Sequence, residues 1–278
     1  MAYTEYIYKC GSSIDHEIHW VGLYGAKGEK REKKNKASPE QIRKQNQWKK
    51  ELYMTRLIRI NFSPGDYWMT LKYKRGARPP LERVTKDLRN FIGRLRRVYK
   101  KRDTTLHWIY RLEIGEKGGV HIHFIVNRIP GEDTDRLIKK EWDKVKDSSG
   151  IFYDLLRDDE DYRRLASYIV KEPDEEVEKQ LSLFDEEDRK AFCKYSRSRN
   201  MKEPEREVHP YKRRTVKSLI MEGPKPKKGY YIDKSSIRLG TNPLTGRSYC
   251  YYTEFKLPQT RMNTKCERDF WQPGGDDA

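Results

Sequence analysis

The chain has 278 residues with a formal net charge of +17, and charged residues (37%) outnumber hydrophobic ones (35%), which predicts a packed core with polar extensions rather than one apolar unit. No apolar run is long enough for a membrane-spanning helix. The four cysteines are far apart and form no CxxC pair, which argues against a disulfide scaffold or a zinc ribbon and favours reduced thiols in a cytoplasm. The excess of positive charge favours a nucleic acid as partner.

The first 53 residues are predicted to form a basic N-terminal extension. Residues 27–50 hold ten Lys and Arg against three Glu. One helix is expected there, because Ser38 can cap it, Pro39 suits its first turn, and Gln41 stands three residues after the cap. The rest of this stretch is predicted to be a solvated arm.

Residues 54–200 are predicted to be the main folded domain. The expected elements, in chain order, are strands at 54–62 and 67–73, a helix at 79–102, strands at 106–113 and 120–127, a helix near 135–145, a strand at 150–156 and a helix at 159–172. Consecutive strands with helices between them predict an α+β fold, in which a central antiparallel sheet has helices packed on one face.

Residues 201–278 are predicted to be a C-terminal extension. Residues 201–228 are basic and contain prolines, which is typical of a linker, and a hairpin is expected within 235–255. Residues 172–188 hold nine acidic residues and one Lys, which predicts an inserted acidic loop or helix.

Two histidines and one glutamate form a candidate metal site. On a strand, His121 and His123 project from one face about 6.6 Å apart. If the preceding strand forms a hairpin with theirs, Glu113 completes a site of two imidazoles and one carboxylate, which suits Mg²⁺ or Mn²⁺ acting as a Lewis acid. Glu116 and His107 are alternatives to Glu113 as the third ligand.

A tyrosine and a lysine form the second candidate. Tyr168 and Lys171 lie three residues apart, so on a helix they share a face. A lysine beside a phenol can favour the phenolate or neutralise charge that builds on a phosphate. Tyr162 is about 240° round the helix from Tyr168, so we predict a single nucleophilic tyrosine.

Together these residues resemble the HUH endonuclease superfamily, in particular the rolling-circle replication initiator (Rep) proteins of plasmids, bacteriophages and integrated elements. Three segments resemble the three Rep motifs in order: the strand DYWMTLKY, then GGVHIHF with its two histidines, then SYIVKE with its Tyr-x-x-Lys. The resemblance covers about residues 54–200.

The resemblance implies a ferredoxin-like sheet that carries the histidines and a facing helix that carries the tyrosine. The metal would polarise the scissile phosphate, and Tyr168 would attack it to form a 5′-phosphotyrosine link and a free 3′-OH. Lys171 would orient the reaction or balance its charge. The implied substrate is single-stranded DNA at an origin, with or without a hairpin. No Walker A motif is present, so helicase and polymerase would come from the host or the element.

Three basic residues, Lys72, Arg111 and Lys117, are expected to contact DNA, and no membrane partner is expected. An HUH relaxase, a single-tyrosine transposase and a non-catalytic protein that binds the origin or RNA are the competing functions. His16 and His19 form an HxxH pair with no accompanying Cys pair or HExxH motif, so structural or surface roles are assigned to them.

Overall fold

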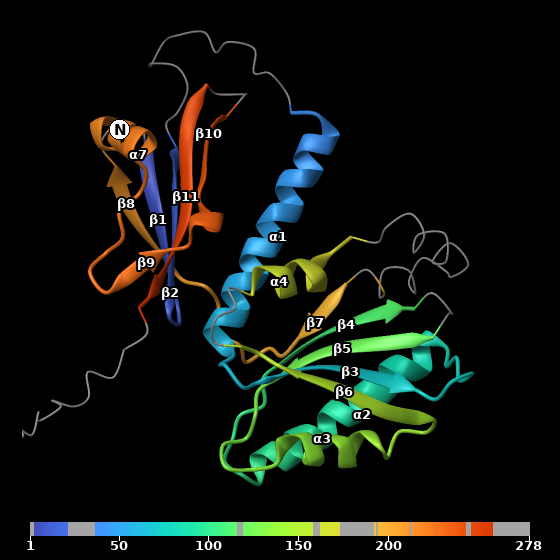
Figure 1. The fold of residues 1–278 in the computed structure, drawn as a ribbon. Helices are drawn as coiled ribbons and strands as arrows, with labels where there is room; N and C mark the ends of the chain where they lie inside the picture. Colours follow the sequence, from blue (N-terminus) through green and yellow to red (C-terminus); the bar gives the residue numbers. More distant parts are fainter. Residues whose placement is uncertain are drawn as a thin grey trace, which may run out of the picture.

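The computed structural model describes residues 3–21, 37–115, 119–157, 162–172, 192, 194–211, 213–242 and 246–257. These residues form two antiparallel sheets, with the long helix α1 (Pro39–Asn61) running between them (Figure 1). The predicted α+β class is confirmed. In the described part of the chain, no helix combines the length and apolar character needed to cross a membrane.

The first sheet, here called the site sheet, has five strands in the order β6-β3-β5-β4-β7. All of its pairings are antiparallel. The bounds are β3 Tyr67–Tyr73, β4 Trp108–Ile114, β5 Val120–Val126, β6 Ser148–Leu155 and β7 Tyr195–Arg197. The predicted strands at 67–73, 106–113, 120–127 and 150–156 therefore match β3 to β6.

Helices cover both faces of the site sheet, so the prediction that they lie on one face is wrong. Helices α2 (Leu81–Lys100) and α3 (Thr134–Trp142) pack on one face, where Phe91, Phe124 and Trp142 meet in a buried core. The end of α1 and helix α4 (Arg163–Val170) cover the other face. Both faces of β4 and β5 carry apolar residues, and these are buried only if helices pack on each side of the sheet.

Helix α1 begins as predicted, with a capping box in which Ser38 and Gln41 each accept a hydrogen bond from the other's backbone N–H. The strand predicted at 54–62 is wrong, because α1 continues to Asn61. Met54, Leu57 and Ile58 follow the helical spacing of i, i+3 and i+4, and all three are fully buried.

The second sheet joins the two ends of the chain. Its strands run in the order β10-β11-β2-β1-β8, and β9 pairs with β11. The bounds are β1 Tyr3–Cys10, β2 Ser13–Trp20, β8 Arg206–Tyr211, β9 Tyr230–Ile232, β10 Arg238–Asn242 and β11 Arg247–Lys256, with a short 3-10 helix η1 at Lys234–Ser236. Helix α7 (Arg213–Glu222) packs on the outer face (Figure 1).

This second sheet is formed by segments that were predicted to be extensions at both ends of the chain. The C-terminal hairpin is confirmed as β10 and β11, but the linker predicted at 201–228 contains β8 and α7. Strand β8 is an exposed edge strand that contains Pro210 and pairs with the distant β1. Its polar sequence gives no local sign of this pairing. The boundaries at 53/54 and 200/201 stay a prediction. The acidic stretch of 172–188 lies, apart from Glu172, outside the described residues.

Candidate active site

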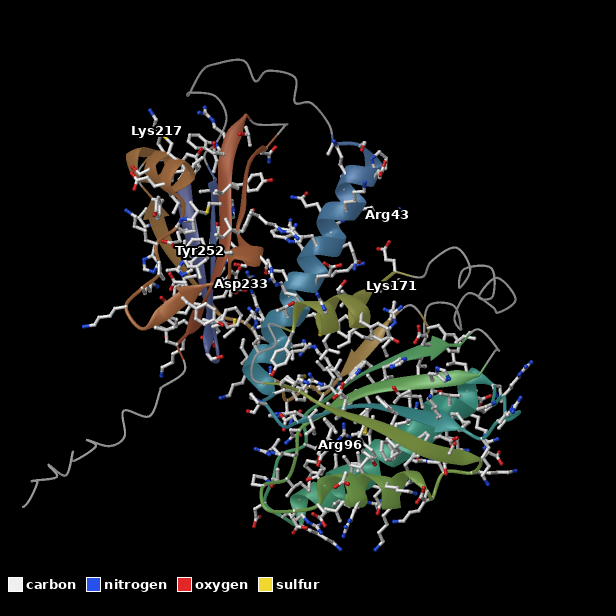
Figure 2. All side chains as sticks on the ribbon, viewed as in Figure 1. Arg43, Arg96, Lys171, Lys217, Asp233 and Tyr252 are labelled. Atoms are coloured by element: carbon white, nitrogen blue, oxygen red, sulfur yellow. The ribbon has the colours of Figure 1, made fainter. Side chains whose placement is uncertain are left out.

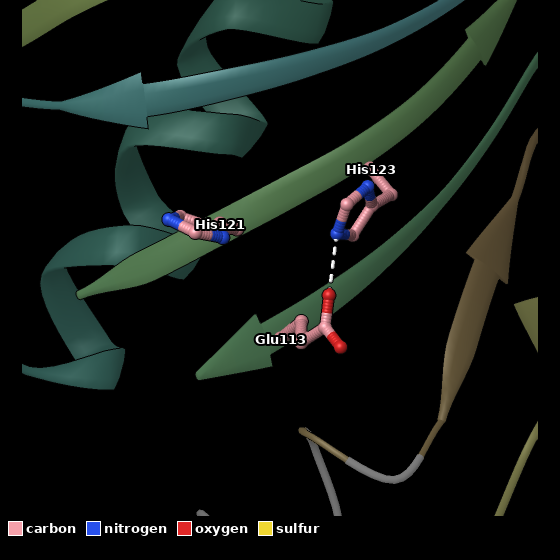
Figure 3. A group of neighbouring side chains, drawn as sticks. All are labelled: Glu113, His121 and His123. Atoms are coloured by element: carbon pink, nitrogen blue, oxygen red, sulfur yellow. Dashed lines mark hydrogen bonds and ion pairs between the residues drawn. The ribbon is translucent and has the colours of Figure 1, made fainter. Parts of the chain in front are cut away.

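The pairing of β4 with β5 brings the three candidate metal ligands together. Glu113 pairs directly with His121, and His123 lies two residues along the same face of β5. Ligand atoms of all three side chains lie within 4.8 Å of one another. His123 Nε2 lies 2.6 Å from Glu113 Oε2, and the two side chains face each other from neighbouring strands (Figure 3). One ion can therefore reach all three residues.

Tyr168 lies on α4, across from this cluster. Its hydroxyl donates a hydrogen bond of 2.5 Å to Glu113 Oε2 and lies 2.7 Å from His123 Nε2. The ring meets the ring of His123 edge-on at a centroid distance of 4.9 Å. The phenol is half-buried, and its hydroxyl is directed at the imidazole and the carboxylate.

The electrostatics of the cluster keep the carboxylate charged and the phenol protonated. The hydrogen bond with His123 lowers the pKa of Glu113 to about 2, with a further contribution from Tyr168. Burial and the hydrogen bond to Glu113 raise the pKa of Tyr168 well above its ordinary value. Burial lowers the pKa of His121, and the nearby charge of Lys72 adds to this. A neutral imidazole and an ionised carboxylate are the forms that bind a metal.

Strand β3 supplies two supporting side chains that the sequence analysis did not assign to the site. Thr70 pairs with His123 across the strands, and its Oγ1 lies 3.3 Å from His123 Nδ1. Trp68 stacks on the His123 imidazole at 5.5 Å and meets Tyr168 edge-on at 5.8 Å. Both residues lie on the face of β3 opposite its buried apolar side chains. This alternation along the strand was the signal in the sequence that could have identified them. A partner on the second ring nitrogen fixes the orientation of a ligating histidine.

Arg111 has a structural contact in place of the predicted contact with DNA. The residue is only 8% exposed, and its Nη1 donates hydrogen bonds of 3.0 Å to the carbonyls of Tyr168 and Ile169. The last carbonyls of a helix have no partner within the helix, and a cation there is favourable. Gln47 of α1 adds a hydrogen bond to the carbonyl of Val170. Arg111 therefore holds the end of the helix that carries Tyr168.

The two other predicted DNA contacts, Lys72 and Lys117, and the predicted catalytic Lys171 differ in position. Lys72 is exposed on β3 and pairs with His121, so it lies at the edge of the site. Lys171 is exposed and comes directly after α4, with a ψ of 131°. The prediction that it shares a helix face with Tyr168 is therefore wrong. A proline follows Glu172 in the sequence, and a proline disfavours the helical conformation in the residue before it. The helix therefore ends before this position. Lys117 lies outside the described residues.

Among the three candidates for the third ligand, Glu113 is the one in the cluster. His107 precedes β4 at the other end of the hairpin, where its backbone N–H donates to Asn127 Oδ1. Glu116 lies outside the described residues. Tyr162 is buried, and its hydroxyl donates to the carbonyl of Arg157.

His16 and His19 lie far from the cluster, on β2 of the second sheet. His16 is buried, bonds Glu5 through Nδ1 at 2.7 Å and stacks on Tyr252 at 4.4 Å. The structural role predicted for it agrees with this packing.

The donor set of the cluster fits a single divalent cation. Two imidazole nitrogens and one carboxylate oxygen converge, and three ligands leave coordination positions open for water or a phosphate oxygen. Within the described residues it is the one group of three or more such side chains that could hold a metal.

A comparison with protein families agrees with this geometry. The family model of the ORF2-type replication-associated protein matches residues 66–174, which include all three ligands and Tyr168. Over these residues the chain is similar to that family. The matched segment runs from the residue before β3 to just past α4, so it contains most of the site sheet together with the facing helix. No curated protein and no solved structure shows a significant match to the chain.

Proposed function

We propose that the chain nicks and rejoins single-stranded DNA at a replication origin through a covalent 5′-phosphotyrosine intermediate. The observation that carries this proposal is the contact of the Tyr168 hydroxyl with two of the three candidate metal ligands, at 2.5 Å from Glu113 and 2.7 Å from His123. A protein that only binds DNA has no need for a phenol at this position.

Glu113, His121 and His123 would hold the cation, Mg²⁺ or Mn²⁺, which when bound supplies Lewis-acid polarisation of the scissile phosphate. Tyr168 is protonated at rest, so its hydroxyl must lose a proton to become a nucleophile. The ionised Glu113 carboxylate accepts a hydrogen bond from this hydroxyl and so orients it at the cluster, and the proton passes to solvent. Arg111 and Gln47 hold the end of α4 and so keep the phenol in place.

The reaction balances as a transfer of one phosphoryl group. The bond from the Tyr168 oxygen to phosphorus forms, the bond from phosphorus to the 3′-oxygen breaks, and the 3′-oxygen takes up a proton. The free 3′-OH can then be extended by a polymerase, with strand separation by a helicase from the host or the element. Attack of a 3′-OH on the phosphotyrosine reverses the step. Lys72 and Lys171 are exposed cations that can offset charge on the DNA backbone.

The test is covalent capture of DNA by the full chain. An origin oligonucleotide labelled at its 3′ end, incubated with the protein and Mn²⁺, should give a labelled protein band that survives denaturing electrophoresis. We expect Tyr168→Phe to abolish this band and Tyr162→Phe, the matched control, to retain it.

A band that persists in Tyr168→Phe would show that Tyr168 is not the nucleophile. Retained DNA binding without an adduct, in Mg²⁺ and in Mn²⁺, would favour the non-catalytic binding protein.

A further inference from the structure

The two faces of the second sheet have different compositions. The outer face packs on α7 through a buried cluster of Tyr3, Ile18, Val216, Cys250 and Tyr252. The inner face is directed toward α1, and the alternation along β1, β2 and β11 places aromatic rings on it: Tyr6, Tyr8, His19, Tyr249 and Tyr251. The inner face is therefore rich in rings and poor in aliphatic residues.

A groove of about 880 Å³ separates this inner face from α1. The rings form one side, and Trp48 and Lys49 of α1 form the other. Arg206 of β8 and Arg247 of β11 also line it, while Glu17, the acidic residue of the groove, is paired with Arg56. The balance of charge in the groove is therefore positive.

The rings make a continuous row across the sheet. Tyr6 lies 5.0 Å from His19, and His19 lies 6.4 Å from Tyr251. Tyr251 then meets Tyr249 at 5.4 Å and Trp48 at 5.0 Å. All five rings are partly exposed, and the Arg206 guanidinium lies 4.9 Å from the centre of the Tyr6 ring at one end of the row. A packed core would bury such rings completely.

We propose that this groove is a second binding site for single-stranded DNA, separate from the candidate active site. Nucleobases would stack on the row of rings, and Lys49, Arg206 and Arg247 would contact the backbone phosphates. Aromatic rows with flanking cations bind single strands, because every base has a face that can stack. The bases of a duplex already stack on one another, so the rings select the unpaired strand. This extends the proposed function and rests on it, because the strand that is nicked would be held on the second sheet as well.

The test measures binding without nicking, so that the two proposals fail separately. The full chain carrying Tyr168→Phe is titrated in EDTA with fluorescent oligothymidylate of about 16 nucleotides. Adding Tyr6→Leu and Tyr251→Leu should weaken binding at least about tenfold, because two stacking surfaces are removed. The matched pair Tyr6→Phe and Tyr251→Phe keeps both rings and should bind within about twofold of the parent.

A charge variant provides a second measurement that keeps every ring of the row. Arg206→Glu should weaken binding and reduce the slope of log affinity against log salt by about 0.7 for each phosphate that the side chain no longer neutralises. Lys217→Glu makes the same charge change on α7, on the opposite side of the sheet (Figure 2), and should leave the slope nearly unchanged.

Three results would overturn this inference. The first is a folded Tyr6→Leu, Tyr251→Leu variant that binds the oligonucleotide as tightly as the parent. The second is an equal fall in affinity in Arg206→Glu and Lys217→Glu. The third is weaker binding of duplex DNA by the Tyr6→Leu, Tyr251→Leu variant while its binding of the single strand is unchanged, which would assign the groove to duplex DNA. A protein that forms no covalent adduct but shows the expected weakening of binding would refute the nicking proposal alone.

Discussion

Replacing Arg111 tests whether this residue holds α4 or contacts DNA. The guanidinium is buried and donates to two carbonyls at the end of the helix, those of Tyr168 and Ile169. A hydrogen bond from a charged donor contributes about 1.5–3 kcal/mol, and its removal leaves a carbonyl unpartnered. Arg111→Met keeps most of the side-chain volume and removes both bonds, so we expect the free energy of unfolding to fall by about 3 kcal/mol or more.

Urea denaturation measures that fall for the whole fold, and amide hydrogen exchange measures it at α4. A local destabilisation of about 3 kcal/mol speeds exchange in α4 by about 150-fold. If the nicking proposal holds, a less constrained Tyr168 should also form the DNA adduct up to about 100-fold more slowly.

Lys72→Met is the matched control. Lys72 lies on the same sheet face but is exposed, so its replacement should change stability by no more than about 0.5 kcal/mol. If Lys72 contacts a phosphate, the salt dependence of binding should weaken by about 0.7 in slope. The reasoning would be refuted if Arg111→Met unfolded at the parent's urea concentration, kept its α4 exchange rates and showed the weaker salt dependence instead.

Two other substitutions probe the support of the site and the link between the sheets. Thr70→Val removes the hydroxyl near His123 Nδ1 and should weaken Mn²⁺ binding about 10- to 100-fold by paramagnetic titration; unchanged affinity would exclude a positioning role. Asp15 is buried, which opposes its charge, but Arg59 and Arg56 outweigh this and hold its pKa below the ordinary value. Its contribution to stability is therefore present above about pH 4 and lost at lower pH. Asp15→Asn should cost about 3–5 kcal/mol at pH 7 and much less at about pH 2, by urea denaturation; an equal cost at both pH values would contradict the ion-pair account.

Local patterns in the sequence were enough to predict the core of the site. Glu113, His121 and His123 lie on two strands joined by a short turn, so strand parity alone places their side chains on one face. The amphipathic α2 and the capping box at Ser38 are local in the same way, because the residues that decide them are within a turn of one another.

The tertiary structure decided what depends on distant partners. Residues 54–62 carry a pattern compatible with a strand as well as the helical spacing of Met54, Leu57 and Ile58, and the burial of these three side chains among elements distant in sequence decides for the helix. The second sheet pairs β2 with β11, whose residues lie more than 200 positions apart, and no periodicity within either strand encodes that partner. Arg111 has the same parity as Glu113, but only the position of α4 makes it a helix anchor rather than a surface cation. Burial and pairing between distant segments are properties of the folded chain, which local spacing does not contain.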